Sequence, residues 1–196
     1  KEYDTWKYVL KHWDSESAEV HRREEEALIE ELELDPGKIV YLNGAFSHDF
    51  MSYLISACDI YAAPSRLEGF GMIQMEALAC GKPVISINVG GPADTVVHGQ
   101  TGYLAEVGET IELHEEWAYE SMGFAADHKI KFKEPKVFAY RASVPDLVKY
   151  TKELLMDDKK REEMGRNALA YAQANFQYQH IAKKALAELE RVFGKK

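Results

Sequence analysis

The residues best suited to chemistry are two carboxylates in the pattern Glu-x7-Glu, Glu68 and Glu76, with a glycine-containing loop between them. An apolar stretch over 59–63 predicts a strand, and Gly69 and Gly71 lead from it into an apolar stretch typical of a helix. A strand that enters a helix through such a loop directs free backbone amides and the positive end of the helix dipole at one place. This geometry binds anions such as a diphosphate, and glycine lets the ligand approach the backbone closely.

The spacing of the two carboxylates matches a ligand with a polar group on each side of a diphosphate. Glu76 lies about five residues into the expected helix, roughly 7 Å along its axis. A nucleotide sugar fits, because Glu68 would accept hydrogen bonds from a hexose and Glu76 from a ribose. The apolar neighbours of Glu76 predict a buried carboxylate, which is costly without a partner. The alternatives are a structural ion pair for Glu76 and a solvated loop position for Glu68. The presence of both glutamates around one strand–glycine–helix junction favours a functional role.

The surrounding segment alternates short apolar strands with helices. Such alternation predicts a doubly wound α/β fold, with a parallel sheet covered by helices on both faces and ligands at the carboxyl ends of the strands. A helix is expected after Ser47, which can serve as its N-cap. The strands are expected at 39–42, 59–63, 84–87 and 102–104, and the helix of the Glu-x7-Glu segment at about 71–80.

Three regions of the chain differ in composition and in hydrophobic pattern. Residues 1–107 hold a partial nucleotide-binding core preceded by a helical segment, and residues 108–143 are an insertion, expected as a short helix plus an extended arm. Residues 144–196 are expected to be helices of the same domain. A further short apolar helix is expected near the start of the sequence, from Trp6, Tyr8, Val9 and Trp13.

Composition excludes several classes of protein. The net charge of −9 without a basic cluster argues against a nucleic-acid partner held through its phosphates. No apolar run approaches the roughly 20 residues needed to cross a bilayer. Cys58 and Cys80 lie in apolar segments outside any metal-ligand or CxxC spacing, which predicts reduced core thiols in the cytoplasm. No Asp-x-Asp stands in a suitable loop for a metal.

The stretch S-R-L-E-G-F-G-M-I-Q-M-E-A-L-A-C-G-K-P-V-I resembles the signature of the family 4 retaining glycosyltransferases, which include glycogen synthase, sucrose synthase and mannosyltransferases. The downstream N-V-G-G-P-A-D-T-V-V-H-G-Q-T-G-Y-L and the upstream I-V-Y-L-N-G-A-F-S are similar to neighbouring blocks of that family. The resemblance is dense over about 39–107 and loose in the terminal helices. It implies the Rossmann-like C-terminal lobe of the two-lobed GT-B fold, the lobe that binds the donor.

The resemblance also implies roles for individual residues. Glu68 would be the catalytic-site carboxylate on the donor sugar and Glu76 would hold the ribose. The amides of Phe70, Gly71 and Met72, with Gly69 before them, would contact the sugar and diphosphate. Gly44 and Phe46 would border the base, although Phe46 would equally suit a core. Gly90 and Gly91 would form a turn near the sugar, or a plain tight turn. The implied reaction transfers a hexose with retention from a UDP-, GDP- or ADP-hexose to an acceptor hydroxyl, without a metal and without a separate cofactor.

The sequence departs from this family in three places. Nothing in 1–37 matches the arginine and lysine that the family directs at the diphosphate, and no amino-terminal acceptor lobe is found. The insertion at 108–143 replaces a direct passage into the next helix. We therefore expect a part of a larger enzyme, with a diverged stand-alone module as the alternative, because a sheet without its first strands would expose an edge.

Three functions remain open. The first is the donor half of a hexosyltransferase. The second is a sugar-nucleotide epimerase, which would need acid and base residues that this segment does not offer. The third is a sugar-nucleotide-binding module without turnover, which binding without transfer would reveal. The expected location is the cytoplasm, and peripheral contact with the inner face of a membrane is left open.

Overall fold

A computed structural model describes residues 6–12 and 16–194 of the chain, with the backbone only for 16–20. The chain divides into two compact units, Lys1–Met51 and Ser52–Lys196. In the described part of the chain, no helix is both long and apolar enough to cross a membrane.

The first unit is a strand–helix–strand crossover. Strand β1 (Tyr8–His12) pairs in parallel with β2 (Ile39–Asn43), and α1 (Glu16–Glu31) and the short 3-10 helix η1 (Pro36–Lys38) lie between them in the chain. The helix expected near the start of the sequence is therefore wrong for Tyr8 and Val9, and Trp13 lies outside the described residues. The backbone of β1 gains its partner from a strand about thirty residues later, which a local apolar pattern does not reveal.

The second unit is built on a three-stranded parallel sheet in the order β3-β4-β5. These strands are β3 (Tyr61–Ala62), β4 (Val84–Ile87) and β5 (Gly102–Ala105), and every residue of β4 and β5 is buried. Helices α3 (Met72–Ala79) and α4 (Gly91–Thr95) belong to the crossovers between the strands. The predicted α/β fold, with parallel sheets flanked by helices, is confirmed.

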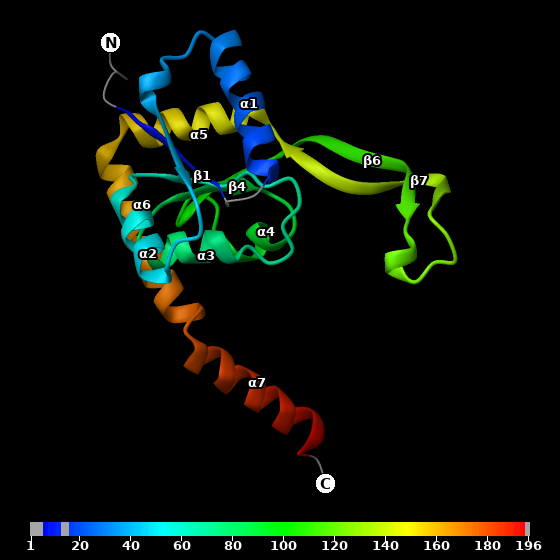
Figure 1. Cartoon of the computed structure of the whole chain (residues 1–196). Coiled ribbons are helices and arrows are strands. Elements are labelled where there is room, and N and C mark those ends of the chain that lie inside the picture. Colours follow the sequence, from blue (N-terminus) through cyan, green and yellow to red (C-terminus); the bar gives the residue numbers. More distant parts are fainter. Residues whose placement is uncertain (1–5, 13–15, 195–196) are drawn as a thin grey trace. The chain divides into compact units, whose positions relative to one another are not determined.

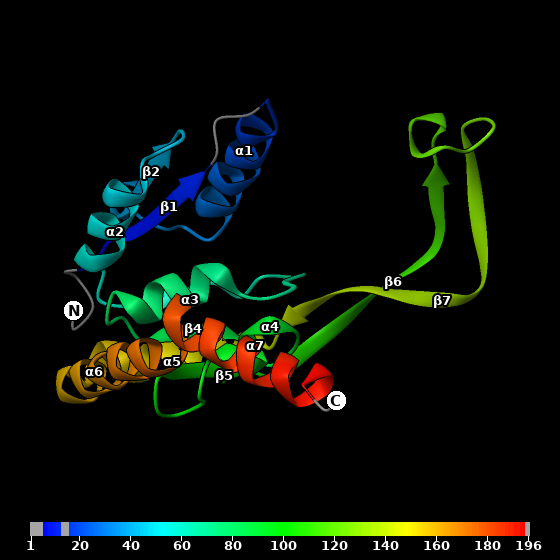
Figure 2. The same ribbon diagram turned by 90° about the horizontal axis from the view of Figure 1, so that it is seen from below.

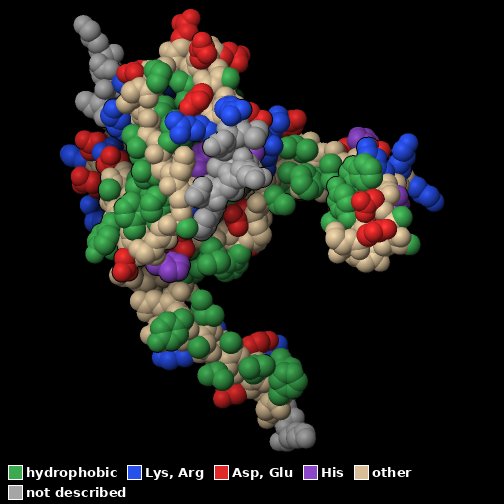
Figure 3. Space-filling view, viewed as in Figure 1, with side chains coloured by type: hydrophobic (Ala, Val, Ile, Leu, Met, Phe, Trp, Pro, Cys, Tyr) green, Lys and Arg blue, Asp and Glu red, His purple; other side chains and the backbone are tan. Residues whose placement is uncertain are grey.

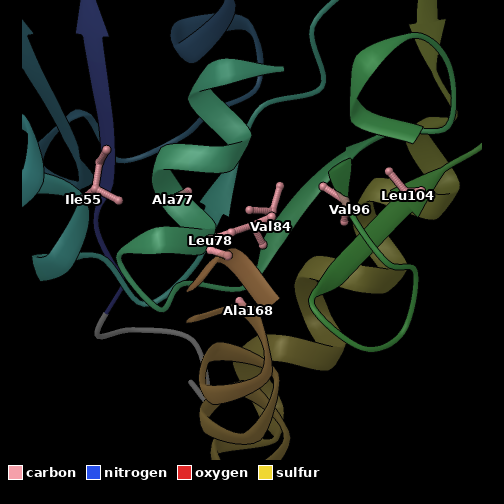
Figure 4. Packing of buried hydrophobic residues seen from close by; sticks show 8 residues of the cluster. Ile55, Ala77, Leu78, Val84, Val96, Leu104 and Ala168 are labelled. Carbon is pink, nitrogen blue, oxygen red and sulfur yellow. The ribbon is translucent and has the colours of Figure 1, made fainter. Parts of the chain in front are cut away.

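Alternation along the strands divides the core between the two faces of this sheet. Val84 and Leu104 pack with Leu78 of α3 and Ala168 on one face (Figure 4). Ile85 and Tyr103, the next residues along their strands, pack on the other face with side chains that include Tyr150 and Leu154. Figure 1 shows α3 and α5 (Val144–Met156) on opposite faces of β4.

The helices expected at residues 144–196 are present as α5, α6 (Asp158–Asn175) and α7 (Tyr178–Phe193). The side chain of Ser143 accepts a hydrogen bond from Asp146 N at 3.3 Å and caps α5. In α7 the apolar residues at helical spacing are exposed rather than packed, as Figure 3 shows for several hydrophobic side chains. These exposed residues are Ile181, Leu186, Leu189 and Val192.

The segment predicted as an insertion is a two-stranded antiparallel ribbon. Strand β6 (Val107–Ala118) pairs with β7 (His128–Ala142), and the 3-10 helix η2 (Glu120–Met122) lies in the connection at its tip. The ribbon extends away from the three-stranded sheet in the views of Figures 1 and 2. At its base, Tyr140 N donates to Arg66 O at 2.9 Å, which ties β7 to the loop that carries Glu68.

Helix α2 (His48–Ala57) spans the division between the two units. The side chain of Ser47 accepts a hydrogen bond from Phe50 N at 3.2 Å, as expected for its N-cap. Ile55 lies in the core of the second unit, within the cluster around Leu78.

Candidate functional site: a glycine-lined helix end

The amino-terminal end of α3 begins at a glycine without a side-chain cap. Gly71 is the N-cap residue and has φ of +87°, a left-handed backbone conformation that favours glycine. The first backbone hydrogen bond runs from Met75 N to Gly71 O at 3.1 Å. The N–H groups of Met72, Ile73 and Gln74 therefore precede the first turn of hydrogen bonds and point out of the helix end, where an anion can accept from them.

Glu68 lies directly beside these amides. Its Oε1 accepts a hydrogen bond from Gly71 N at 3.0 Å, and its side chain is half-buried. The carboxylate is thus held at the mouth of the helix by one charge-assisted bond, with a second oxygen to offer to a ligand. Phe70 is 59% exposed, and a β-carbon on Gly69 would meet no atom within 4 Å, so this stretch of the loop is accessible.

A second glycine turn packs against the Glu68 loop, backbone on backbone. Gly91 N donates to Glu68 O at 3.3 Å. A β-carbon on Gly91 would lie 2.1 Å from the carbonyl carbon of Phe70, and one on Gly90 would lie 2.5 Å from Glu68 O. Only glycines allow this approach, so the predicted turn at Gly90 and Gly91 does meet the predicted Glu68 loop in space.

The expectation that Glu76 is buried is wrong. Glu76 is exposed on the outer side of α3, together with Met72 at 64% and Ile73 at 39%. The residues that α3 buries are Gln74, Ala77 and Leu78. An apolar helix buries only the face that packs on its sheet, so apolar neighbours in sequence do not enclose a side chain on the other face.

Glu76 still carries its charge close to the sheet. Burial raises the pKa of Tyr61 in β3, and the negative charge of Glu76 raises that pKa further. The carboxylate therefore lies within electrostatic reach of the phenol of Tyr61 and stays accessible to solvent or to a ligand. An exposed acceptor at this place is compatible with a ligand hydroxyl and needs no structural ion pair.

The polar residue that sequence reasoning missed is Gln74. Its side chain is fully buried, and its amide nitrogen donates to Ala63 O at 3.3 Å and to Ser86 Oγ at 3.2 Å. The available signal was its position, because Gln74 stands three and four residues before Ala77 and Leu78 on the buried stripe of α3.

Gly44 and Phe46 lie in the first unit, just beyond the carboxyl end of β2. Gly44 has φ of +131° and its N–H donates to His12 O at 3.2 Å. The Phe46 ring is half-buried and stacks on Phe50, with ring centroids 4.5 Å apart. Their assignment to the nucleobase stays a prediction.

The arrangement in the second unit can hold a diphosphate at the amides of α3 and place Glu68 beside a group attached to it. Backbone amide dipoles that are already fixed in place can stabilise negative charge on such a ligand, and they do not have to reorient when the charge develops.

Comparison with known proteins agrees with this geometry. The family model for glycosyl transferases group 1 matches residues 18–119, more than half of the 196-residue chain. An uncharacterised glycosyltransferase of Methanocaldococcus jannaschii is 41% identical over 76 residues, which are 39% of this chain and 22% of that protein. The N-acetyl-alpha-D-glucosaminyl L-malate synthase of Bacillus anthracis is 34% identical over 99 residues, 45% of this chain and 26% of that protein.

Solved structures share the fold at low sequence identity. Anabaena HepE in complex with UDP superposes with a TM-score of 0.68 at 24% identity, covering 96% of this chain and 42% of HepE. Sucrose-phosphate synthase from Thermosynechococcus elongatus gives a TM-score of 0.67 at 23% identity, covering 96% of this chain and 39% of that enzyme. The chain thus spans less than half the length of these proteins.

Proposed function

The chain belongs to the glycosyl transferases group 1 family, and on this premise we propose that it binds the donor of a retaining hexosyl transfer. The donor is a nucleotide-diphosphate hexose. Its diphosphate lies at the amides of α3, its hexose beside Glu68 and the Gly90–Gly91 turn, and its ribose beside Glu76.

The observation that carries the proposal is the position of Glu68 at the amino-terminal end of α3. The Glu68 carboxylate accepts from Gly71 N at 3.0 Å, next to the unbonded amides of the first helical turn. A neutral sugar linked to a diphosphate complements this arrangement. Its phosphate charges can accept hydrogen bonds from the helix amides, and its sugar hydroxyls can donate to the Glu68 carboxylate.

The names of relatives support the same class of ligand. HepE has also been solved in complex with UDP-glucose and with UDP and glucose. Proteins of Rhodococcus that are 43% and 47% identical over 70 and 62 residues are D-inositol 3-phosphate glycosyltransferases. These names support a glycosyl donor, and the choice of a hexose and of retention is our inference.

In the proposed reaction, the bond between the anomeric carbon and the diphosphate oxygen breaks as the acceptor oxygen bonds to the same face of that carbon. The acceptor proton passes to the departing diphosphate. Negative charge therefore grows on phosphate oxygens that the helix amides already face, which lowers the barrier. Glu68 orients the sugar through its hydroxyls.

Calorimetry tests the assignment, with UDP-, GDP- and ADP-hexoses and the matching nucleoside diphosphates as probes. Glu76→Ala is expected to weaken binding of both classes by about 10- to 100-fold, because a charge-assisted hydrogen bond to the ribose is lost. Glu68→Ala is expected to weaken binding of the nucleotide hexose while the nucleoside diphosphate binds nearly as before. NMR of the anomer first released from the donor checks retention.

The matched control is Glu163→Ala on α6, an exposed glutamate of the same unit outside the proposed site, which should leave both affinities unchanged. Unchanged donor affinity in Glu76→Ala would remove the ribose assignment. A wild-type protein that binds none of the nucleotide hexoses would overturn the proposal as a whole.

A further inference from the structure

We propose that Gln74 is a positioning residue whose buried carboxamide holds the end of α3, and with it the Glu68 loop, in a fixed place on the sheet. The inference rests on the proposed donor site at that helix end. Gln74 itself is fully buried and touches no donor in this proposal.

The amide nitrogen of Gln74 joins α3 to two strands at their carboxyl ends. It donates to Ala63 O, the residue after β3, and to Ser86 Oγ in β4. Ser86 Oγ in turn donates to Ala63 O at 2.7 Å, which closes a triangle of polar groups. Gln74 and Ser86 are both 0% exposed, so these bonds are made where no water competes for them.

The orientation of the carboxamide is determined by its partners. Ala63 O accepts and cannot donate, so the NH2 group must face it and the carbonyl oxygen must face the other way. On that side, a β-carbon on Gly71 would lie 3.2 Å from Gln74 Oε1 and 3.2 Å from Thr95 Oγ1. The Gln74 carbonyl therefore lies directly under the glycine that caps the helix.

The buried polar groups beneath α3 extend to the second loop of the site, the Gly90–Gly91 turn. Thr95 Oγ1 donates to Gly91 O at 3.0 Å, within the short helix α4 that begins at the Gly90–Gly91 turn. The carboxamide of Gln74 and the hydroxyl of Thr95 together line the space below Gly71. A shift of either group moves the backbone that presents Glu68 or the backbone that packs against it.

Packing alone does not explain a glutamine at this position. Gln74 Oε1 is buried and has no hydrogen-bond partner among the described residues. An unpaired buried acceptor is costly, and an apolar side chain of similar size would avoid that cost. Directional bonds from one amide to two strand ends supply what an apolar side chain lacks, a fixed position of the helix relative to the sheet.

The test measures how much the hexose adds to binding, as the ratio of the Kd of the nucleoside diphosphate to the Kd of its hexose conjugate. The probe is whichever UDP-, GDP- or ADP-hexose wild-type protein binds most tightly. We expect Gln74→Leu to keep the denaturant midpoint near the wild-type value and to lower this ratio about tenfold, since a displacement of about 1 Å is enough to impair such contacts.

The matched control is Leu78→Ala, one turn further along the buried face of α3. It creates a cavity, so its denaturant midpoint should fall while the Kd ratio is retained. Ser86→Ala removes one partner of the Gln74 amide and should show a smaller loss of the ratio, and it keeps the proposal testable if Gln74→Leu does not fold.

The failures of the two proposals differ. If the wild-type protein binds no nucleotide hexose, the donor site itself is wrong and the role of Gln74 falls with it. If wild type binds and both Gln74→Leu and Ser86→Ala retain the wild-type ratio, the positioning role alone is overturned. A ratio that falls equally in Leu78→Ala would also overturn it, because the effect would then follow from lost stability.

Discussion

The end of α3 and the β6–β7 ribbon use polar side chains in opposite ways. Beneath α3, Gln74 and Ser86 are fully buried and neutral, and each makes directional bonds to a named partner. On the ribbon, Arg141 pairs with Glu109 at 3.0 Å with about half of each side chain exposed, at 54% and 56%. Burial turns a hydrogen bond into a geometric constraint, whereas exposure leaves an ion pair replaceable by water.

This difference indicates which region of the molecule has little tolerance for substitutions. The two glycine loops of the site meet backbone to backbone above the buried polar layer, so small changes there have no room to relax. The ribbon is joined to the sheet mainly through its base, where Tyr140 N donates to Arg66 O. We expect changes along the ribbon to stay local.

The largest effect is expected from Gly91→Ala. The new β-carbon would lie within 2.1 Å of the Phe70 backbone, so the Glu68 loop must move, at a cost of about 3 kcal/mol in the free energy of unfolding. Urea denaturation measures this, and Gly69→Ala is the control, because a β-carbon there meets no atom within 4 Å. Equal stability of the two variants would contradict the close approach of the loops.

An intermediate effect is expected at Glu153, which joins α5 to β5 and α6. Its carboxylate accepts from Tyr103 Oη at 2.7 Å and is paired with Lys160. The hydrogen bond from Lys160, and then that from Tyr103, lowers the pKa of Glu153 below its ordinary value. The resulting stability is present above the unfolded-state pKa and is lost as the pH falls through the lowered folded-state pKa.

Glu153→Gln should therefore cost about 1 kcal/mol in the free energy of unfolding at neutral pH, and less at acidic pH as the wild-type carboxyl becomes protonated through its lowered pKa. Urea titrations of both proteins at neutral and at acidic pH give the difference. A cost that stays constant across this range would mean that the charge of Glu153 contributes nothing and that the side chain acts by packing alone.

The smallest effect is expected from Arg141→Ala on the ribbon. Because the Arg141–Glu109 pair is exposed, its loss should change the free energy of unfolding by about 0.5 kcal/mol or less. Donor affinity should not change. A loss comparable to that of Gly91→Ala would break the contrast between the two regions and would mean that the ribbon is coupled to the Glu68 loop through Arg66.

Local patterns were sufficient for much of the second unit. The strand expected at 84–87 is β4 with the same bounds, and the helix expected at about 71–80 is α3 at Met72–Ala79. Continuous apolar runs bounded by glycine and proline carry this information in a few neighbouring residues. The loop that carries Glu68, between β3 and α3, followed from the same glycine and proline positions.

The ribbon was predictable only in part. Its sequence alternates lysine with apolar residues over K-I-K-F-K at 129–133, a period typical of a strand, yet the pairing of β6 with β7 joins residues as far apart as Val107 and Ala142. Alternation indicates a strand but does not identify its partner. The expected short helix is present only as η2, a single 3-10 turn at the tip.

The sequence by itself determined the order of strand, glycine loop and helix, because that order depends on nearest neighbours along the chain. The same neighbours led to the prediction of an anion site between Glu68 and Glu76. Only the tertiary structure decided that α3 buries Gln74 and exposes Glu76, and that Gly91 packs on Phe70. Which face of a helix is covered, and which loops touch, depends on where distant segments pack, and that information lies in no single stretch of residues.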